Sequence, residues 1–118
     1  MYQQEMLRGN TDTLLLALLE NEAMYGYQIV KEVNQRSSGY FAFKEGTLYP
    51  ALHRLEKANL VEGRWEDTPN NVRRRYYMIT AKGQEALCDR LSEWRQFTSA
   101  MNSIMLPGMS PETGTKFT

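Results

Sequence analysis

The chain has few of the residues from which several protein classes build their sites. Among its 118 residues there is one cysteine, Cys88, and one histidine, His53. One residue of each kind excludes a disulfide framework and a Cys/His zinc site within a single chain. A Cys–His nucleophile pair would need these two residues, and each falls in a helical pattern that explains it more simply. The nucleotide-binding motifs G-x-G-x-x-G and the P-loop do not occur. We therefore expect neither an enzyme nor a metal or cofactor site.

Long apolar runs and an excess of charge of either sign are absent as well. No stretch approaches the roughly 18 to 20 apolar residues that span a bilayer, and residues 1–10 hold no secretory core, so we expect a cytoplasmic protein without a membrane partner. Fourteen Lys and Arg residues balance fourteen Asp and Glu residues. Any binding of nucleic acid must therefore use positive charge that is concentrated on one face. The composition, 42% hydrophobic and 24% charged, is typical of one folded core.

The first half of the chain carries the spacing of helices. Asn10 or Thr11 is suited to cap a helix over residues 10–22, whose leucines make it apolar on most sides and predict a central position. Apolar residues recur at helical spacing after Tyr25-Gly26-Tyr27 and predict a second, amphipathic helix. We expect Gly26 to allow a close approach of its neighbours.

A third helix opens within residues 46–50, where Pro50 is tolerated if it lies in the first turn. Asn59 is suited to end this helix in the left-handed conformation. The helix has two distinct faces, because side chains three and four residues apart share a side. The packing face holds Leu48, Ala51, Leu52 and Leu55. The free face holds Tyr49, Pro50, His53, Arg54 and Lys57.

A β-hairpin is expected after this helix. Residues 60–65 and 73–79 favour strands, and turn-forming residues lie between them. Because strand side chains alternate, Arg73 and Arg75 point to one side and Arg74 to the other. The tip of the hairpin is therefore basic and its base is apolar.

The last predicted element is a long helix from Ala81 to about Met105, which Thr80 can cap. At 1.5 Å per residue it is about 37 Å long, more than one small domain covers. Apolar residues with one polar member recur at heptad spacing and predict a homodimer seam. The seam residues are Leu87, Leu91, Trp94, Thr98, Met101 and Met105.

This order of elements predicts a mainly α fold with a small β-hairpin, a winged helix-turn-helix followed by a long C-terminal dimerisation helix. We expect the winged-helix domain over residues 1–80, the dimerisation helix over 81–106 and a disordered tail over 107–118. The third helix would enter the major groove of double-stranded DNA while the wing follows the phosphates. The expected DNA-binding residues are Lys44, Thr47, Tyr49, Pro50, His53, Arg54, Lys57, Arg73, Arg74 and Arg75.

Three motifs together resemble the PadR family of bacterial transcriptional regulators: Y-G-Y-Q-I at residues 25–29, G-T-L-Y-P-A-L at 46–52 and R-R-R-Y-Y-M-I-T at 73–80. The resemblance spans about residues 6–105. It implies a winged-helix dimer, joined through its last helix, that represses a promoter with an inverted-repeat operator and is released by a small molecule. The single long final helix is similar to the shorter PadR subgroup.

The region of Met6 together with Trp94 resembles the multidrug-sensing LmrR type. That resemblance implies that the two Trp94 rings of a dimer face each other and hold a planar aromatic effector, and that Met6 lines the same opening. Sensors of this type can carry an acid one turn after the tryptophan, where this chain has Thr98, and Arg90 lies one turn before it. Neutral or anionic planar compounds therefore fit at least as well as cations.

Simpler interpretations stay open beside these. Arginines on an edge strand can serve only to prevent aggregation. Trp94 at a heptad position can be dimer core without any ligand. An alternative function is a winged-helix protein-interaction module that senses no ligand and binds another protein through its long helix.

Overall fold

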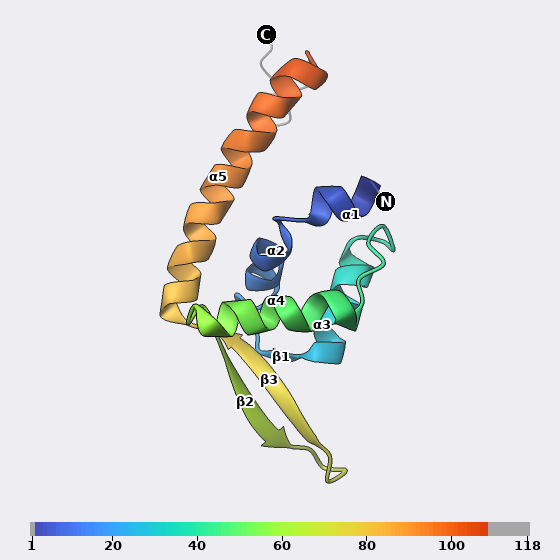
Figure 1. Cartoon of the computed structure of the whole chain (residues 1–118), viewed down its shortest axis with the longest axis vertical. Helices are drawn as coiled ribbons and strands as arrows, with labels where there is room; N and C mark the ends of the chain where they lie inside the picture. Colours follow the sequence, from blue (N-terminus) through green and yellow to red (C-terminus); the bar gives the residue numbers. More distant parts are fainter. Residues whose placement is uncertain (1, 109–118) are drawn as a thin grey trace. The chain divides into compact units, whose positions relative to one another are not determined.

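The computed structural model describes residues 2–108, and Figure 1 follows them along the chain. The elements are α1 (Tyr2–Leu7), α2 (Thr11–Leu18), β1 (Met24–Tyr25), α3 (Gly26–Arg36), α4 (Glu45–Lys57), β2 (Val61–Asp67), β3 (Arg73–Ile79) and α5 (Ala81–Met105). This is the predicted winged helix with a long last helix, so the fold class is confirmed. Most of the predicted tail lies outside the described residues.

The chain forms two compact units that divide after Leu87, within α5. The first unit holds the helices α1 to α4, the sheet and the start of α5. The second holds the rest of α5. No helix among residues 2–108 is long and apolar enough to cross a membrane.

Helix α2 lies at the centre of the first unit and packs against α3 and α4, as its leucines predicted. Leu15 and Leu16 are fully buried. The helix ends at Leu18, earlier than expected, because the amide of Glu20 bonds back to the carbonyl of Ala17 and tightens the last turn. Asn10 is the N-cap residue of α2, as expected, but its side chain makes no capping hydrogen bond to this helix. The Asn10 side chain donates instead to the Met6 carbonyl at 2.9 Å and so caps the end of α1. The sequence analysis did not predict this helix.

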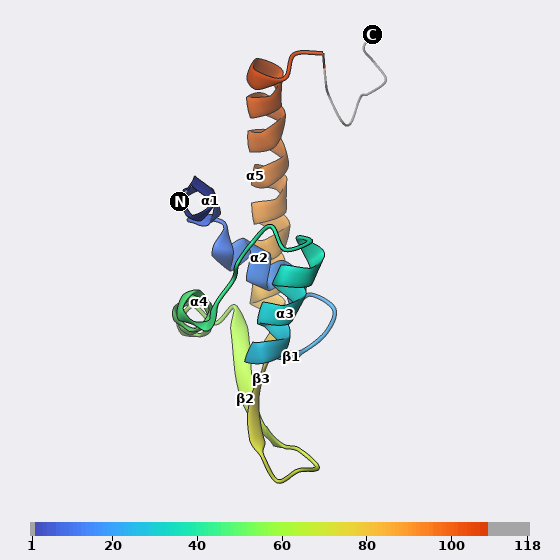
Figure 2. The same cartoon turned by 90° about the vertical axis from the view of Figure 1, so that its right-hand side faces the viewer.

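The hairpin β2–β3 extends away from the three helices α2, α3 and α4, with the loop that joins its strands at the far end (Figures 1 and 2). Its strands pair antiparallel from Val61 opposite Ile79 to Asp67 opposite Arg73. The two-residue strand β1 pairs with the other edge of β3, so the strand order is β1-β3-β2. A strand this short leaves no periodic signal, which explains why the sequence did not reveal it.

Thr80 fixes the start of α5 to the base of the wing, as expected for a capping residue. Its hydroxyl accepts a bond from the Gly83 amide at 2.9 Å and donates to the Asn59 carbonyl at 2.7 Å. A side chain at position 83 would collide with the carbonyl of Leu60. The first turns of α5 therefore belong to the winged-helix unit.

Candidate nucleic-acid interface

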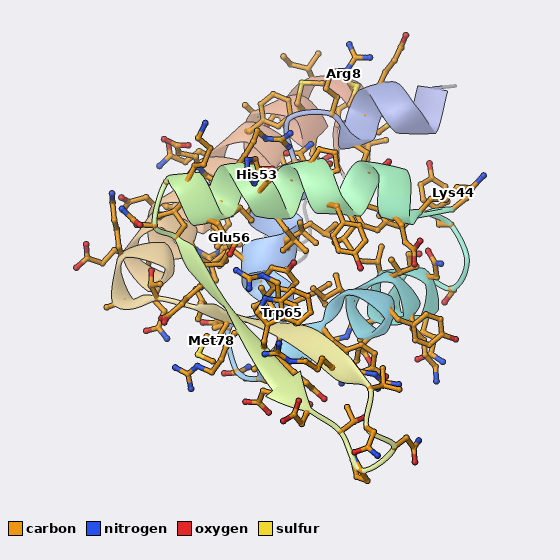
Figure 3. The ribbon with its side chains drawn as sticks, turned by 60° about the horizontal axis from the view of Figure 1, so that its bottom comes forward. Arg8, Lys44, His53, Glu56, Trp65 and Met78 are labelled. Carbon is orange, nitrogen blue, oxygen red and sulfur yellow. The ribbon has the colours of Figure 1, made fainter. Side chains whose placement is uncertain are left out.

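Helix α4 presents the two faces that the sequence predicted. The buried face holds Leu48, Ala51, Leu52 and Leu55, each no more than 1% exposed. The other face is exposed along the helix, from Lys44 at the N-terminal end to His53 (Figure 3). The exposed residues are Lys44, Thr47, Tyr49, Pro50, His53, Arg54 and Lys57.

The position of Pro50 differs from the prediction. The helix begins at Glu45, so Pro50 lies inside it and not in the first turn. The carbonyl of Gly46, four residues earlier, consequently receives no amide from residue 50. Gly46 is exposed, and nothing lies within 4 Å of the position that its Cβ would take. Water can therefore satisfy this carbonyl, which limits the cost of a proline inside the helix.

Tyr49 joins α4 to the start of α3, although its side chain is partly exposed. Its hydroxyl and ring lie directly over Gly26, where a side chain of any size would collide with them. The expected close approach at Gly26 is thus confirmed. Tyr49 is therefore held by packing against Gly26, while it remains 44% exposed.

Arg54 is held by a carboxylate from another helix. Its guanidinium Nη2 lies 2.8 Å from Oδ1 of Asp12, in the first turn of α2. The Arg54 side chain is still 59% exposed, so the pair leaves part of the guanidinium accessible. Asp12 therefore orients Arg54 along the surface without removing it from solvent.

The side of the wing that faces α4 carries alternating arginine and aromatic side chains. The Trp65 ring lies between the guanidinium groups of Arg73 and Arg75, at 5.4 and 5.5 Å from its centroid. Arg75 also lies 5.8 Å from the Tyr77 ring, which is buried at the base. These distances are within the range of cation–π attraction. Trp65 is half-exposed. The sequence analysis did not select it as a binding residue.

Arg74 lies on the opposite side of the wing, as strand alternation predicted. Its guanidinium sits 4.3 Å above the Tyr25 ring, and Tyr25 in turn contacts the edge of Tyr76. Arg73 approaches Asp67 at 3.5 Å, but both side chains of that pair are mostly exposed. Such a pair contributes little and is easily exchanged for another anion. Arg73 and Arg74 both present charge to solvent.

Arg75 differs from the two arginines before it. Its Nη2 lies 2.8 Å from Oε2 of Glu56 on α4, and both side chains are only about one-third exposed or less. The hydrogen bond to Glu56 raises the pKa of Arg75. Figure 3 shows Glu56 on the side of α4 that faces the hairpin and Met78 on the far side of the strands. The charge of Arg75 is therefore directed at the protein.

Only some of the basic residues at the candidate interface form ion pairs with acidic residues. Neither Lys44 nor Lys57 forms an ion pair with another residue in the range 2–108. Within the same part of the chain, no group of three His, Cys, Asp or Glu side chains is arranged to hold a metal ion. The site is thus made of one helix face and one hairpin, on which Lys44, Lys57, Arg73 and Arg74 are exposed cations without a close acidic partner among the residues described.

The second unit exposes apolar side chains along one side of α5. The most exposed are Trp94, Phe97, Met101, Ile104 and Met105. The Trp94 and Phe97 rings lie 6.2 Å apart, and the Thr98 hydroxyl donates to the Trp94 carbonyl, which leaves its methyl group free to pack. The heptad pattern did not select Phe97 and Ile104. They follow Trp94 and Met101 by three residues and lie beside them on the same side of the helix.

Three further residues were sequence candidates for the seam or the ligand site. Leu87 is 2% exposed within its own chain, so it has almost no area left for a partner. Met6 is exposed on α1 in the first unit. Arg90 is half-buried at the beginning of the second unit.

An exposed helix in the position of α4, supported by two further helices and followed by a basic hairpin, defines a winged helix-turn-helix protein of the kind that regulates transcription. A model of the "Transcriptional regulator PadR-like family" matches residues 15–89. The chain belongs to this family, and the match covers α3, α4, the whole wing and the start of α5.

Known proteins similar to this chain agree with that assignment. An uncharacterized protein of Lysinibacillus sphaericus is 32% identical over 105 residues, which cover 89% of this chain and 96% of the relative. A transcriptional regulator from Clostridium thermocellum has a TM-score of 0.78 at 32% identity, covering 85% of this chain and 97% of its own. PadR of Bacillus subtilis, solved in complex with operator DNA, shares the fold with a TM-score of 0.64 at 22% identity, over 72% of this chain and 48% of its own.

Proposed function

We propose that the protein is a homodimeric repressor that binds an inverted-repeat operator in double-stranded DNA. The observation that carries this proposal is the exposed face of α4 together with a wing on which Arg73 and Arg74 present their charge to solvent. The Bacillus subtilis relative of the same fold was solved with operator DNA, which supports a DNA partner for this chain.

The contacts divide between bases and phosphates. Thr47, Pro50 and His53 lie on the free face of α4 and reach base edges in the major groove, together with the accessible parts of Tyr49 and Arg54. Lys44 and Lys57 at the ends of the helix and Arg73 and Arg74 on the wing contact phosphates. Phosphate contacts set affinity and register, whereas the α4 face sets sequence preference.

Salt dependence tests this proposal directly. If each subunit neutralises three or four phosphates, the dimer has a log–log slope of affinity against salt of about −5 to −7, from roughly 0.9 per contact. The measurement is a titration of DNA from upstream of the protein's own gene at several salt concentrations. Truncating Arg74 should weaken binding to every sequence alike, whereas changing His53 should alter which sequence is preferred. A slope near zero on that DNA contradicts the proposal.

Dimerisation through α5 completes the repressor. The apolar side of the helix, from Leu91 to Met105, has the heptad spacing by which two helices pack along each other. Leu87 is excluded from this seam because its own domain already buries it. The two recognition helices of such a dimer read half-sites about one helical turn apart.

A planar aromatic molecule at the seam is the proposed release signal. Trp94 is 44% exposed and has Phe97 beside it, so two copies would offer four aromatic rings to a flat compound. Arg90, Thr98 and Met6 are the further residues proposed to line the site. Since Arg90 is the charged member of this set, neutral and anionic compounds are the proposed class.

A further inference from the structure

We infer that Glu56 and Arg75 form a strut that fixes the wing against the recognition helix, and that Arg75 positions the wing without touching DNA. The inference rests on the proposed DNA-binding function and gives a positioning role to two residues of the interface.

The strut joins the two elements that are proposed to bind DNA. Glu56 lies near the end of α4 and Arg75 in the middle of β3, and their side chains meet at 2.8 Å. Between them the chain makes a tight turn, in which Asn59 is left-handed at φ 63° and the Leu60 amide bonds to the Leu55 carbonyl at 2.9 Å. The ion pair therefore ties the hairpin back to the helix at a point beyond this turn.

The surroundings of Arg75 hold its guanidinium in that direction. It lies flat over the backbone of Gly63 on β2, where an added Cβ would come within 2.6 Å of its Nε atom. The rings of Trp65 and Tyr77 flank it on the same side of the hairpin. A residue with a side chain at position 63 would push the guanidinium away from Glu56. The small residue, the two rings and the carboxylate together define one orientation.

An ion pair between the wing and α4 would limit how far the wing can bend. A two-stranded ribbon is only marginally stable by itself and bends easily. The wing and α4 must reach the phosphates and the major groove at the same time, so the angle between them decides how many contacts form together. An ion pair that sets this angle before binding reduces the cost of ordering the interface.

The competing interpretation gives opposite results. In that interpretation Glu56 only masks Arg75 in the free protein, and Arg75 moves to a phosphate when DNA binds. Removing the Glu56 charge would then strengthen DNA binding, because a repulsive anion disappears and Arg75 is released. If the strut exists, Glu56→Gln weakens DNA binding by about tenfold, since each of two subunits loses a charge-assisted hydrogen bond of modest net strength.

The salt slope separates positioning from phosphate contact at Arg75. Arg75→Gln should lower affinity and leave the slope of the wild-type dimer unchanged, because no phosphate contact is lost. The matched control is Arg74→Gln, the neighbouring residue on the outer side of the wing. It should reduce the magnitude of the slope by about 1.8, from roughly 0.9 per subunit. A reduction of the same size for Arg75→Gln overturns the inference, and so does tighter binding by Glu56→Gln.

Charge reversal supplies a second readout. The single variants Glu56→Arg and Arg75→Glu should each bind DNA poorly, and the double variant should recover a measurable part of the affinity, because the pair is rebuilt with exchanged ends. If Arg75 contacted phosphate, the double variant would stay as weak as Arg75→Glu. Thermal unfolding of all variants shows whether each is folded before its affinity is interpreted.

Failure of the proposed function is distinguishable from failure of the strut. If the wild-type protein shows no salt-dependent binding to DNA, the proposed function fails. The coupling of Glu56 and Arg75 is then measured in a double-mutant cycle of unfolding free energies, where independent effects of the two changes overturn the strut as well.

Discussion

The arginines of the candidate interface differ in how much of their charge is free for DNA. Arg54 and Arg75 form close ion pairs with Asp12 and Glu56, whereas Arg73 makes only a loose, mostly exposed pair. Pairs of the loose kind contribute little and exchange readily for another anion. The number of arginines in the motif therefore overstates the number of phosphate contacts. Burial and partners, which sequence spacing does not contain, decide the role of each one.

Gly26 tests the packing that holds Tyr49 in place. Gly26→Ala should lower the free energy of unfolding by about 1–3 kcal/mol, because the new methyl group collides with the Tyr49 hydroxyl and ring. The control is Gly46→Ala on α4, where no atom lies within 4 Å of the new methyl group. That variant should be neutral or more stable by up to about 1 kcal/mol, because alanine favours the helix. Chemical denaturation of both variants gives the comparison, and equal effects would contradict the assigned contact.

Tyr77 gives the winged-helix unit a dependence on alkaline pH. Burial raises the pKa of Tyr77 above its ordinary value of 10.0, and the nearby Glu56 carboxylate adds to the effect. The folded state therefore holds this proton more tightly than the unfolded state, so the associated stability is complete below pH 10 and is lost as the pH rises through the raised pKa.

The measurement compares the wild type with Tyr77→Phe between about pH 9 and pH 11. The stability of the wild type should fall more steeply over that interval than the stability of the variant, because phenylalanine has no proton to lose. Parallel curves would mean that burial does not hold the Tyr77 proton in the folded state.

At the scale of whole elements, periodicity identified the long segments, although α2 ends and α4 begins at other residues than expected. The two faces of α4, both arms of the wing and the bounds of α5 follow from spacing, turn residues and the Thr80 cap. Periodicity failed for α1 and β1, because six and two residues give too few repeats. The pairs Arg54–Asp12 and Arg75–Glu56 join residues 42 and 19 positions apart. Only the tertiary fold brings such residues together, so a single sequence does not reveal them.

Helix α5 exposes more apolar residues than the heptad pattern selected. A strict heptad count selected Trp94, Thr98 and Met101, while exposure adds Phe97 and Ile104 at 57% and 79%. The resulting stripe is wider than a two-helix seam needs. A wide apolar stripe suits packing against more than one neighbour, or around an opening between two helices.

Phe97 provides a test of this stripe as the dimer interface. Phe97→Glu should weaken dimerisation at least about a hundredfold, since two apolar rings lose their burial and two like charges face each other. The matched control is Gln96→Glu, which adds the same charge at the preceding residue, about 100° around the helix from Phe97 and off the apolar stripe. Sedimentation or light scattering over a range of concentrations measures both. If the control dissociates as readily as Phe97→Glu, the stripe is not the interface.

At the scale of the whole molecule, regulation needs a ligand that distinguishes two arrangements of the dimer. A compound that binds both arrangements equally well shifts no population, whatever its affinity. The DNA surface belongs to the first unit and the aromatic stripe to the second. If the proposed effector binds at the stripe, it would have to act through the separation or angle of the two recognition helices, and its effect would be measured as a change in operator affinity.

The two tryptophans, one on the wing and one on α5, allow the ligand site to be located by fluorescence. In Trp65→Phe the only remaining tryptophan is Trp94, and planar neutral or anionic aromatic compounds should quench it by stacking on the indole. In Trp94→Phe the same compounds should leave the Trp65 emission unchanged, although the protein still dimerises. Arg90→Gln should weaken anionic compounds more than neutral ones, because a charge-assisted contact is lost. Quenching that persists in Trp94→Phe, or equal effects of Arg90→Gln on both compound classes, would place the ligand away from the seam.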